Sequence, residues 1–233
     1  IYLIDQMLKL QTISDFNKSD KSIKQKIKYF SNNYKLQPIF ILIKPDLDNF
    51  TNTIKKELYE IKIKNLIKSG LINLEISWTN NKNWLDYVSK IKLKFPEINL
   101  GSASIVNKKS IDDSIKIGTA YSMMRFWDKD LLNYAKTKKH LLIPGIKNIK
   151  DLKEAITLDC KIVKIYPVKN KDKLIKISQY QNIDFIAAGG LSISDLDLYK
   201  SLGYKAIIIG DKAFKNSKID PKIYEWLKKT ELK

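Results

Sequence analysis

The sequence predicts an α/β protein with the (β/α)₈ TIM barrel fold and an N-terminal helical extension. Two observations support this prediction. From Ile39 onward, short β-branched runs alternate with amphipathic helical stretches. Strand-then-helix alternation indicates a parallel sheet with crossover helices. Eight such units favour a closed barrel, with an open parallel sheet as the alternative.

The eight expected strands are short and apolar. They cover Ile39–Lys44, Leu71–Ser77, Ile98–Ile105, Ala120–Ser122, Leu141–Ile143, Lys161–Tyr166, Ile183–Ala187 and Lys205–Ile209. The helical patterns between them cover Thr51–Lys68, Asn83–Phe95, Lys108–Lys116, Lys129–Lys136, Ile149–Thr157, Lys171–Gln181 and Ser194–Leu202. We therefore expect one barrel domain over residues 37–233.

Residues 1–36 lie outside this alternation. Ile1–Leu10 and Lys21–Phe30 have helical patterns, and a polar stretch separates them. We interpret residues 1–36 as a helical extension that packs on the barrel or on a neighbouring subunit. A loosely ordered arm is an equal alternative.

Composition argues against several classes of partner. The longest apolar runs, such as Pro38–Ile43, are far shorter than the roughly 18 residues of a membrane span, so we expect no membrane partner. The net charge is +18, but Arg125 is the only arginine and the lysines are scattered. Because phosphate and base recognition favours arginine, we expect no nucleic-acid partner. Cys160 is the single cysteine, which fits a reducing cytoplasm.

The sixth expected strand carries a lysine where barrels usually have apolar residues. Period-two alternation within Lys161–Tyr166 places Val163 and Ile165 on the side that faces the helices. Lys164 and Tyr166 then point into the barrel. Desolvation lowers the pKa of a buried lysine and yields the neutral amine that attacks a carbonyl to form an imine.

The second expected strand supplies a carboxylate for this lysine. Alternation within Leu71–Ser77 places Leu74 and Ile76 outward and Glu75 inward. Strands two and six lie opposite each other, and interior layers come from alternate strands, so Glu75 and Lys164 are expected to meet near the axis. A carboxylate there supplies the proton transfers that imine chemistry needs. A buried ion pair without a function is the plainer alternative.

The C-terminal ends of the other strands, where barrel enzymes have their sites, carry small and polar residues. The candidates are Ser104, Pro144, Gly145, Gly189, Gly190, Gly210 and Asp211. Ser104 can donate a hydrogen bond to a substrate carboxylate, and the proline–glycine turn leaves a backbone amide near the site. Glycines after strands seven and eight are the usual phosphate cradle of this fold.

Other chemistries lack the residues they need. His140 is the only histidine and lies at the entrance of strand five, so we interpret it as a surface or boundary residue rather than a catalytic base. Only Glu75 and Asp211 reach the C-terminal ends as metal ligands, so we expect no metal. Met123–Trp127 is interpreted as a packing loop from which Arg125 can reach a substrate anion.

Several short motifs follow one another in a characteristic order. They are Leu74–Ser77, Phe95–Pro96, Gly101–Ser104, Leu142–Gly145, Val163–Pro167 and Ala188–Leu191. On these motifs, the chain from about Pro38 to Phe214 resembles the 2-keto-3-deoxy-6-phosphogluconate (KDPG) aldolases, also known as 4-hydroxy-2-oxoglutarate (KHG) aldolases.

The resemblance implies a class I aldolase that cleaves a 2-keto-4-hydroxy acid to pyruvate and an aldehyde. It implies that Lys164 forms the Schiff base and that Glu75 is the general acid/base. Ser104 stands where the family contacts the pyruvyl carboxylate, and Gly189 and Gly190 match the phosphate loop. The resemblance also implies a cytoplasmic homotrimer that needs no cofactor.

This chain departs from the family at several places, which include an insertion between strand one and Gly70. Thr79 stands where the family has an arginine that binds substrate anions. Asp211 replaces a phosphate-contacting serine, and its negative charge is expected to repel a phosphate. Strand four runs into Ser122-Met-Met rather than Ser-Pro-Gly. These departures motivate a second hypothesis, a catalytically reduced barrel that binds a keto acid or serves in an assembly.

Overall fold

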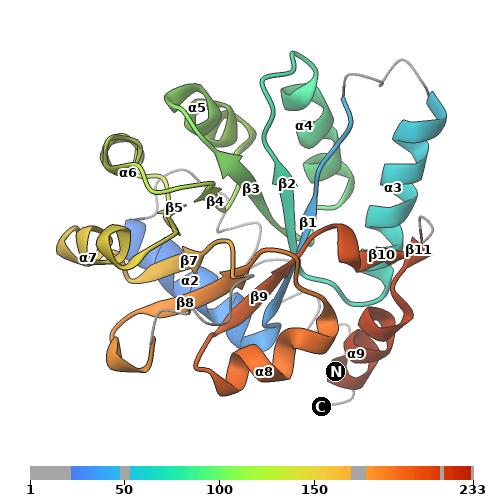
Figure 1. The fold of residues 1–233 in the computed structure, drawn as a ribbon. Coiled ribbons are helices and arrows are strands. Elements are labelled where there is room, and N and C mark those ends of the chain that lie inside the picture. Colours follow the sequence, from blue (N-terminus) through green and yellow to red (C-terminus); the bar gives the residue numbers. More distant parts are fainter. Residues whose placement is uncertain (1–21, 48–52, 169–176, 216–217, 232–233) are drawn as a thin grey trace.

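The structure is a computed structural model that describes residues 22–47, 53–168, 177–215 and 218–231. Its strands form a nearly closed parallel barrel with helices on the outside (Figure 1), which confirms the predicted fold. The strands are β1 (Ile39–Ile43), β2 (Asn73–Ser77), β3 (Asn99–Ile105), β4 (Tyr121–Met124), β5 (Leu142–Ile143), β6 (Gly145–Ile146), β7 (Ile162–Ile165), β8 (Asp184–Ala188) and β9 (Ala206–Ile209).

The fifth barrel strand is divided into β5 and β6. β5 pairs with β4, and β6 pairs with β7. Pro144 lies between the two pieces and has no N–H to donate, so the ladder is interrupted there. The sequence prediction ended this strand too early, at Ile143. It also ended the fourth strand too early, since β4 continues through Met124.

The outer helices are α3 (Thr53–Lys68), α4 (Trp84–Lys94), α5 (Lys108–Ile117), α6 (Lys129–Thr137), α7 (Ile149–Thr157), α8 (Leu196–Ser201) and α9 (Pro221–Glu231). Among them, α5, α6 and α7 begin at side-chain caps. Asn107, Asp128 and Asn148 accept hydrogen bonds from backbone N–H groups in the first turns of α5, α6 and α7. These caps satisfy donors that a helix start leaves open, and they fix where each helix leaves its strand.

Short elements complete the connections between strands and helices. They are the 3₁₀ turns η2 (Ile177–Gln179), η3 (Ile193–Asp195) and η4 (Asp211–Ala213), and the antiparallel pair β10 (Phe214–Lys215) and β11 (Lys218–Ile219). The predicted helix Lys171–Gln181 lies largely outside the described residues, and η2 is its described part. The predicted helix Ser194–Leu202 is divided into η3 and α8.

Two layers of apolar side chains hold the barrel together. Leu74 and Val163 belong to the layer between the strands and the helices. Phe40, Tyr121 and Ile208 belong to a second cluster, which fills the barrel itself. Alternate residues along one strand thus serve different layers, as the period-two pattern predicts.

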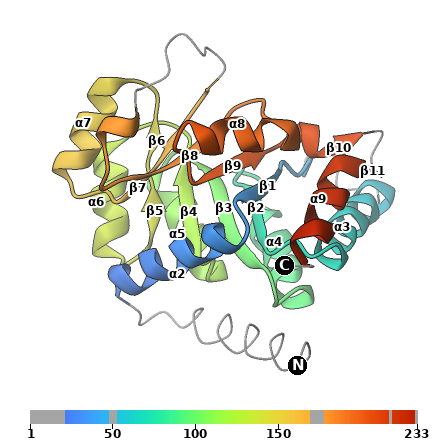
Figure 2. The same ribbon diagram turned by 90° about the horizontal axis from the view of Figure 1, so that it is seen from below.

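Helix α2 (Ile23–Leu36) closes the N-terminal end of the barrel (Figure 2). It begins at a capping box formed by Ser22 and Gln25. The buried ring of Phe30 lies 5.3 Å from that of Phe40 on β1, centroid to centroid. The Tyr34 hydroxyl donates to Asp184 at the start of β8.

The second predicted N-terminal helix therefore packs on the barrel. It extends to Leu36, six residues beyond the predicted end at Phe30. The predicted helix Ile1–Leu10 lies outside the described residues. Among the described helices, none combines the length and apolar character needed to cross a bilayer.

Candidate active site

Lys164 on β7 points into the barrel, as the alternation predicts. Its side chain is buried, and the residue is only 6% exposed. Val163 and Ile165 on either side belong to the layer that faces the helices. The Nζ amine donates a hydrogen bond to the carbonyl oxygen of Met124 at the end of β4. The amine also lies 5.6 Å from the ring centroid of Tyr166.

The surroundings of Lys164 favour its neutral form. Burial lowers the pKa of the amine below its usual range, because the charged form loses its hydration. The negative charge of Glu75 opposes this shift, whereas the positive charge of Arg125 adds to it. A larger share of the amine is therefore neutral near pH 7, in the form that can attack a carbonyl carbon.

Glu75 on β2 also points into the barrel and is 1% exposed. Burial raises the pKa of its carboxyl toward neutrality, and the charge of Lys164 and a hydrogen bond from Tyr121 offset part of this rise. Among the described contacts, neither a hydrogen bond nor an ion pair joins Glu75 directly to Lys164. The two groups interact through the barrel interior, where Glu75 can both take up and release a proton near pH 7.

Ser104 lies at a bulge near the end of β3. The register between β3 and β4 shifts between Ser102 and Ile105, and Ser104 has a φ of 60°, in the left-handed region. Bulges of this kind re-aim a side chain, and strained backbone is common at sites. Ser77 Oγ, at the end of β2, donates to Ser104 Oγ over 2.8 Å.

Pro144 and Gly145 lie beside Lys164. The carbonyl oxygen of Pro144 accepts a hydrogen bond of 2.9 Å from the backbone N–H of Lys164, and Gly145 is the register partner of Lys164. A Cβ atom on Gly145 would lie 2.6 Å from the carbonyl oxygen of Arg125. Because Gly145 has no side chain, the end of β4 can lie close to it. The Met124 carbonyl oxygen at this end of β4 accepts the hydrogen bond from the Lys164 amine.

The loops after β8 and β9 carry the other candidates. Gly189 and Gly190 follow β8 with φ values of 117° and 71°. Gly210 follows β9, and Asp211 forms an exposed ion pair of 3.3 Å with Lys44 at the end of β1. The charge that was expected to repel a phosphate therefore has a cation beside it, although solvent screens such an exposed pair.

The loop predicted after β4 is shorter than expected. Met123 and Met124 are buried strand residues, so this part of the prediction was wrong. Arg125 and Phe126 are exposed beyond the strand end. The Phe126 ring lies 6.2 Å from that of Tyr166, between centroids.

Sequence reasoning missed several contacts of the site. Tyr121 donates to Glu75, Ser77 donates to Ser104, and Lys44 pairs with Asp211. Each contact joins residues that lie on different strands or directly after them, so strand register would have been needed to find it. Thr79 lines an open cleft after β1 and β2 together with Pro45, Asp46, Leu47, Asn80, Asn81 and Lys82. Within the described part of the chain, no cluster of three potential metal ligands occurs.

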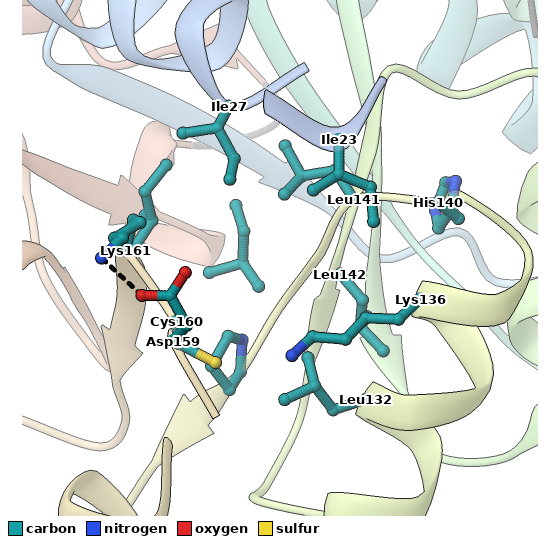
Figure 3. Close-up of a pocket in the computed structure, with 13 residues that line it drawn as sticks. Ile23, Ile27, Leu132, Lys136, His140, Leu141, Leu142, Asp159, Cys160 and Lys161 are labelled. Carbon is teal, nitrogen blue, oxygen red and sulfur yellow. Dashed lines mark ion pairs between the residues drawn. The ribbon is translucent and has the colours of Figure 1, made fainter. Parts of the chain in front are cut away.

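His140 is buried, which contradicts its interpretation as a surface or boundary residue. It is 4% exposed, and its Nε2 lies 2.7 Å from Ser122 Oγ. A cavity of about 60 Å³ beside it, lined from α2, α6 and the starts of β5 and β7, is shown in Figure 3. The prediction failed because α2, which covers this end of the barrel, cannot be placed from local pattern.

We expect the buried His140 to make the protein less stable in acid. Burial, with a contribution from the charge of Lys26, lowers its pKa from 6.5 to about 3. Below pH 6.5 the unfolded chain therefore binds a proton that the folded chain does not, and this group favours unfolding as pH falls. Between pH 7.5 and 5, it should reduce the free energy of unfolding by about 2 kcal/mol.

Urea denaturation of wild type and His140→Gln, followed by tryptophan fluorescence at both pH values, measures this effect. Glutamine keeps a polar group near Ser122 but does not titrate. Glu75 acts in the opposite direction, because its raised pKa stabilises the fold as pH falls toward 4.5. Its effect is common to both proteins, so the comparison isolates His140. Parallel pH dependence in the two proteins would contradict the expectation.

Comparisons with known proteins agree with the fold. A curated 2-dehydro-3-deoxy-phosphogluconate aldolase from Pseudoalteromonas atlantica is 27% identical over 143 residues, covering 60% of this chain and 66% of the relative. A KDPG aldolase structure from Legionella pneumophila, with pyruvate captured at low pH as a covalent carbinolamine intermediate, superposes with a TM-score of 0.67 at 14% identity. This match covers 86% of this chain and 95% of that one.

A second structural match supports the same fold. A 2-keto-3-deoxy-6-phosphogluconate aldolase from Zymomonas mobilis superposes with a TM-score of 0.67 at 20% identity, covering 90% of this chain and 96% of that one. The family model for KDPG and KHG aldolases matches residues 52–229, about three quarters of the sequence. This chain therefore belongs to the KDPG and KHG aldolase family of carbon–carbon lyases.

Proposed function

We propose that this protein is a class I aldolase that cleaves a 2-keto-4-hydroxy acid to pyruvate and an aldehyde through an imine on Lys164. The main support for the proposal is that Lys164 and Glu75, both inside the barrel, have pKa values shifted in opposite directions. Burial shifts the pKa of Lys164 downward and that of Glu75 upward, and neither side chain is tied to the other by a direct hydrogen bond. Such a pair suits amine attack and proton transfer near pH 7.

Imine formation comes first. The neutral amine of Lys164 adds to the C2 carbonyl of the substrate, and the carbinolamine loses water to give a protonated imine. The carbinolamine named for the Legionella enzyme supports this step. Burial of Lys164 in the barrel lowers the pKa of the attacking amine, so a larger share of it is unprotonated near neutral pH than for an exposed lysine.

Bond cleavage needs one base and one acid, and Glu75 can serve as both. Its carboxylate takes the proton of the C4 hydroxyl while the C3–C4 bond breaks and the electron pair flows to the imine nitrogen. The aldehyde leaves, and an enamine remains on Lys164. Glu75 then returns the proton to C3, and water hydrolyses the imine to release pyruvate and the free amine.

The residues around the pair would hold the two ends of such a substrate. Because Ser77 donates to Ser104, the Ser104 proton is available for the pyruvyl carboxylate. Tyr166, Pro144 and Gly145 lie beside Lys164, where they would border the reacting carbons. The loops after β8 and β9, with Gly189, Gly190, Gly210 and Asp211, would face the distal end of the substrate.

Borohydride trapping tests the proposal. Pyruvate and sodium borohydride together should add a stable reduced adduct to the peptide that carries Lys164, which peptide mass analysis detects. Lactate is the matched control, because it has the same carbon chain but no keto group. A folded protein that forms no adduct with pyruvate would contradict the imine mechanism.

The same experiment separates the second hypothesis, which the departures at Thr79 and Asp211 motivate. Pyruvate that raises the melting temperature without an adduct or turnover would favour a keto-acid-binding protein. The cytoplasmic location and the homotrimer implied by the family resemblance stay predictions, and sedimentation of the purified protein would measure the subunit number.

A further inference from the structure

Three neighbouring strands place a tyrosine hydroxyl on the carboxyl of Glu75. Glu75 on β2 is the register partner of Gly101 on β3, and Gly101 is the register partner of Tyr121 on β4. The Tyr121 hydroxyl reaches across Gly101 and donates to Glu75 Oε1 over 3.3 Å. A Cβ atom on Gly101 would lie 2.3 Å from the Tyr121 ring, so this path requires glycine in the middle strand.

The ring of Tyr121 is held in place from the closed end of the barrel. Tyr121 has no solvent-exposed surface. Its ring centroid lies 4.5 Å from that of Phe30 on α2 and 6.0 Å from that of Phe40 on β1, both with edge-to-face geometry. Such packing restricts the phenol to one orientation, so the hydroxyl stays directed at Glu75.

We propose that Tyr121 is a positioning residue of the reaction, which fixes the Glu75 carboxyl and stabilises its ionised form. The inference rests on the proposed function, in which Glu75 moves the protons. A hydroxyl donor binds a carboxylate more strongly than a neutral carboxyl group. Tyr121 therefore favours the form of Glu75 that takes the proton from the substrate hydroxyl.

The charged and titratable groups around the pair agree with this role. Lys164 on β7 acts on Glu75 in the same direction as Tyr121, and Arg125 beyond β4 acts on Lys164. Burial and the charge of Glu75 raise the pKa of Tyr121, with a smaller contribution from Tyr29 on α2. The phenol therefore stays protonated and acts as the donor throughout the working pH range.

Tyr121→Phe removes the hydroxyl and keeps the ring. The hydrogen bond from Tyr121 lowers the pKa of Glu75, so its loss should raise that pKa further. The acidic limb of the kcat–pH profile for cleavage should move upward by about 0.5 to 1 pH unit. At low pH, kcat should fall about three- to tenfold, while at pH values above the limb it should approach that of the wild type.

Two further variants control this experiment. Tyr34→Phe removes another buried hydroxyl from the same cluster, one that contacts Asp184 and Ser31 rather than Glu75, and its profile should match the wild type. Gly101→Ala places a methyl group against the Tyr121 ring and should shift the limb in the same direction as Tyr121→Phe. A shifted limb in Tyr121→Phe together with a wild-type profile in Tyr34→Phe excludes a general loss of packing as the cause.

The readouts separate failure of the inference from failure of the proposed function. Borohydride trapping of pyruvate on Lys164 should persist in Tyr121→Phe and reports on the imine alone. Titration of the ¹³C-labelled Glu75 carboxyl by NMR, assigned with Glu75→Gln, reports on Tyr121 without any need for turnover. An unchanged carboxyl titration, or a kcat reduced equally at every pH, would overturn the positioning role even in a protein that forms the imine.

Discussion

Replacing Lys164 by methionine is expected to lower kcat/KM for cleavage by at least about a thousandfold, because no other buried amine is available to the described site. Methionine has similar length and suits the apolar surroundings, so the barrel should stay folded. Its free energy of unfolding should be equal to or higher than that of the wild type, since a desolvated amine is removed from the interior. Pyruvate release and urea denaturation measure the two effects.

Lys161→Met is the matched control. Lys161 precedes β7, is about half exposed and pairs with Asp159 at the surface. Its replacement should leave cleavage within about twofold of wild type, because exposed ion pairs contribute little to stability. If Lys164→Met retained most of its activity, Lys164 could not be the reacting amine.

Replacing Glu75 by glutamine is expected to lower kcat by about a hundred- to ten-thousandfold, the usual contribution of a general acid/base group. Glutamine keeps the shape and can still accept a hydrogen bond from Tyr121, but it cannot exchange protons. Imine formation should be slowed rather than abolished, so borohydride should still label Lys164 after longer incubation. Single-turnover cleavage and the time course of labelling separate these two effects.

The control is Glu225→Gln on the exposed surface of α9, which should leave both rates unchanged. An unaltered kcat in Glu75→Gln would remove Glu75 from the proton transfers. Complete loss of labelling together with loss of the folded state would instead identify Glu75 as a structural residue. Circular dichroism spectra of the variant distinguish the two results.

The inward direction of Lys164 and Glu75 could be predicted because it depends on local alternation alone. Val163, Ile165, Leu74 and Ile76 are all apolar and pack against the helices, so their polar neighbours had to face the barrel. The strand–helix order, and hence the barrel, follows from the same local patterns. These features require no knowledge of how distant segments are aligned.

Contacts that depend on register or on packing between distant segments could not be predicted. Tyr121 reaches Glu75 only because Gly101 is the partner of both residues across β3. His140 is buried only because α2 folds back over the starts of the strands. Pro144 divides its strand in a way that the run Leu141–Ile143 alone does not reveal.

The closure of the barrel by α2 has a consequence for water at the site. Phe30 and Tyr34 fill the N-terminal end, so solvent exchange with Glu75 and Lys164 takes place mainly through the C-terminal mouth, where a ligand would also enter. A ligand that enters through this mouth therefore also displaces water from Glu75 and Lys164. The dielectric constant around both groups falls as the mouth fills, and their mutual attraction grows strongest when the ligand is in place.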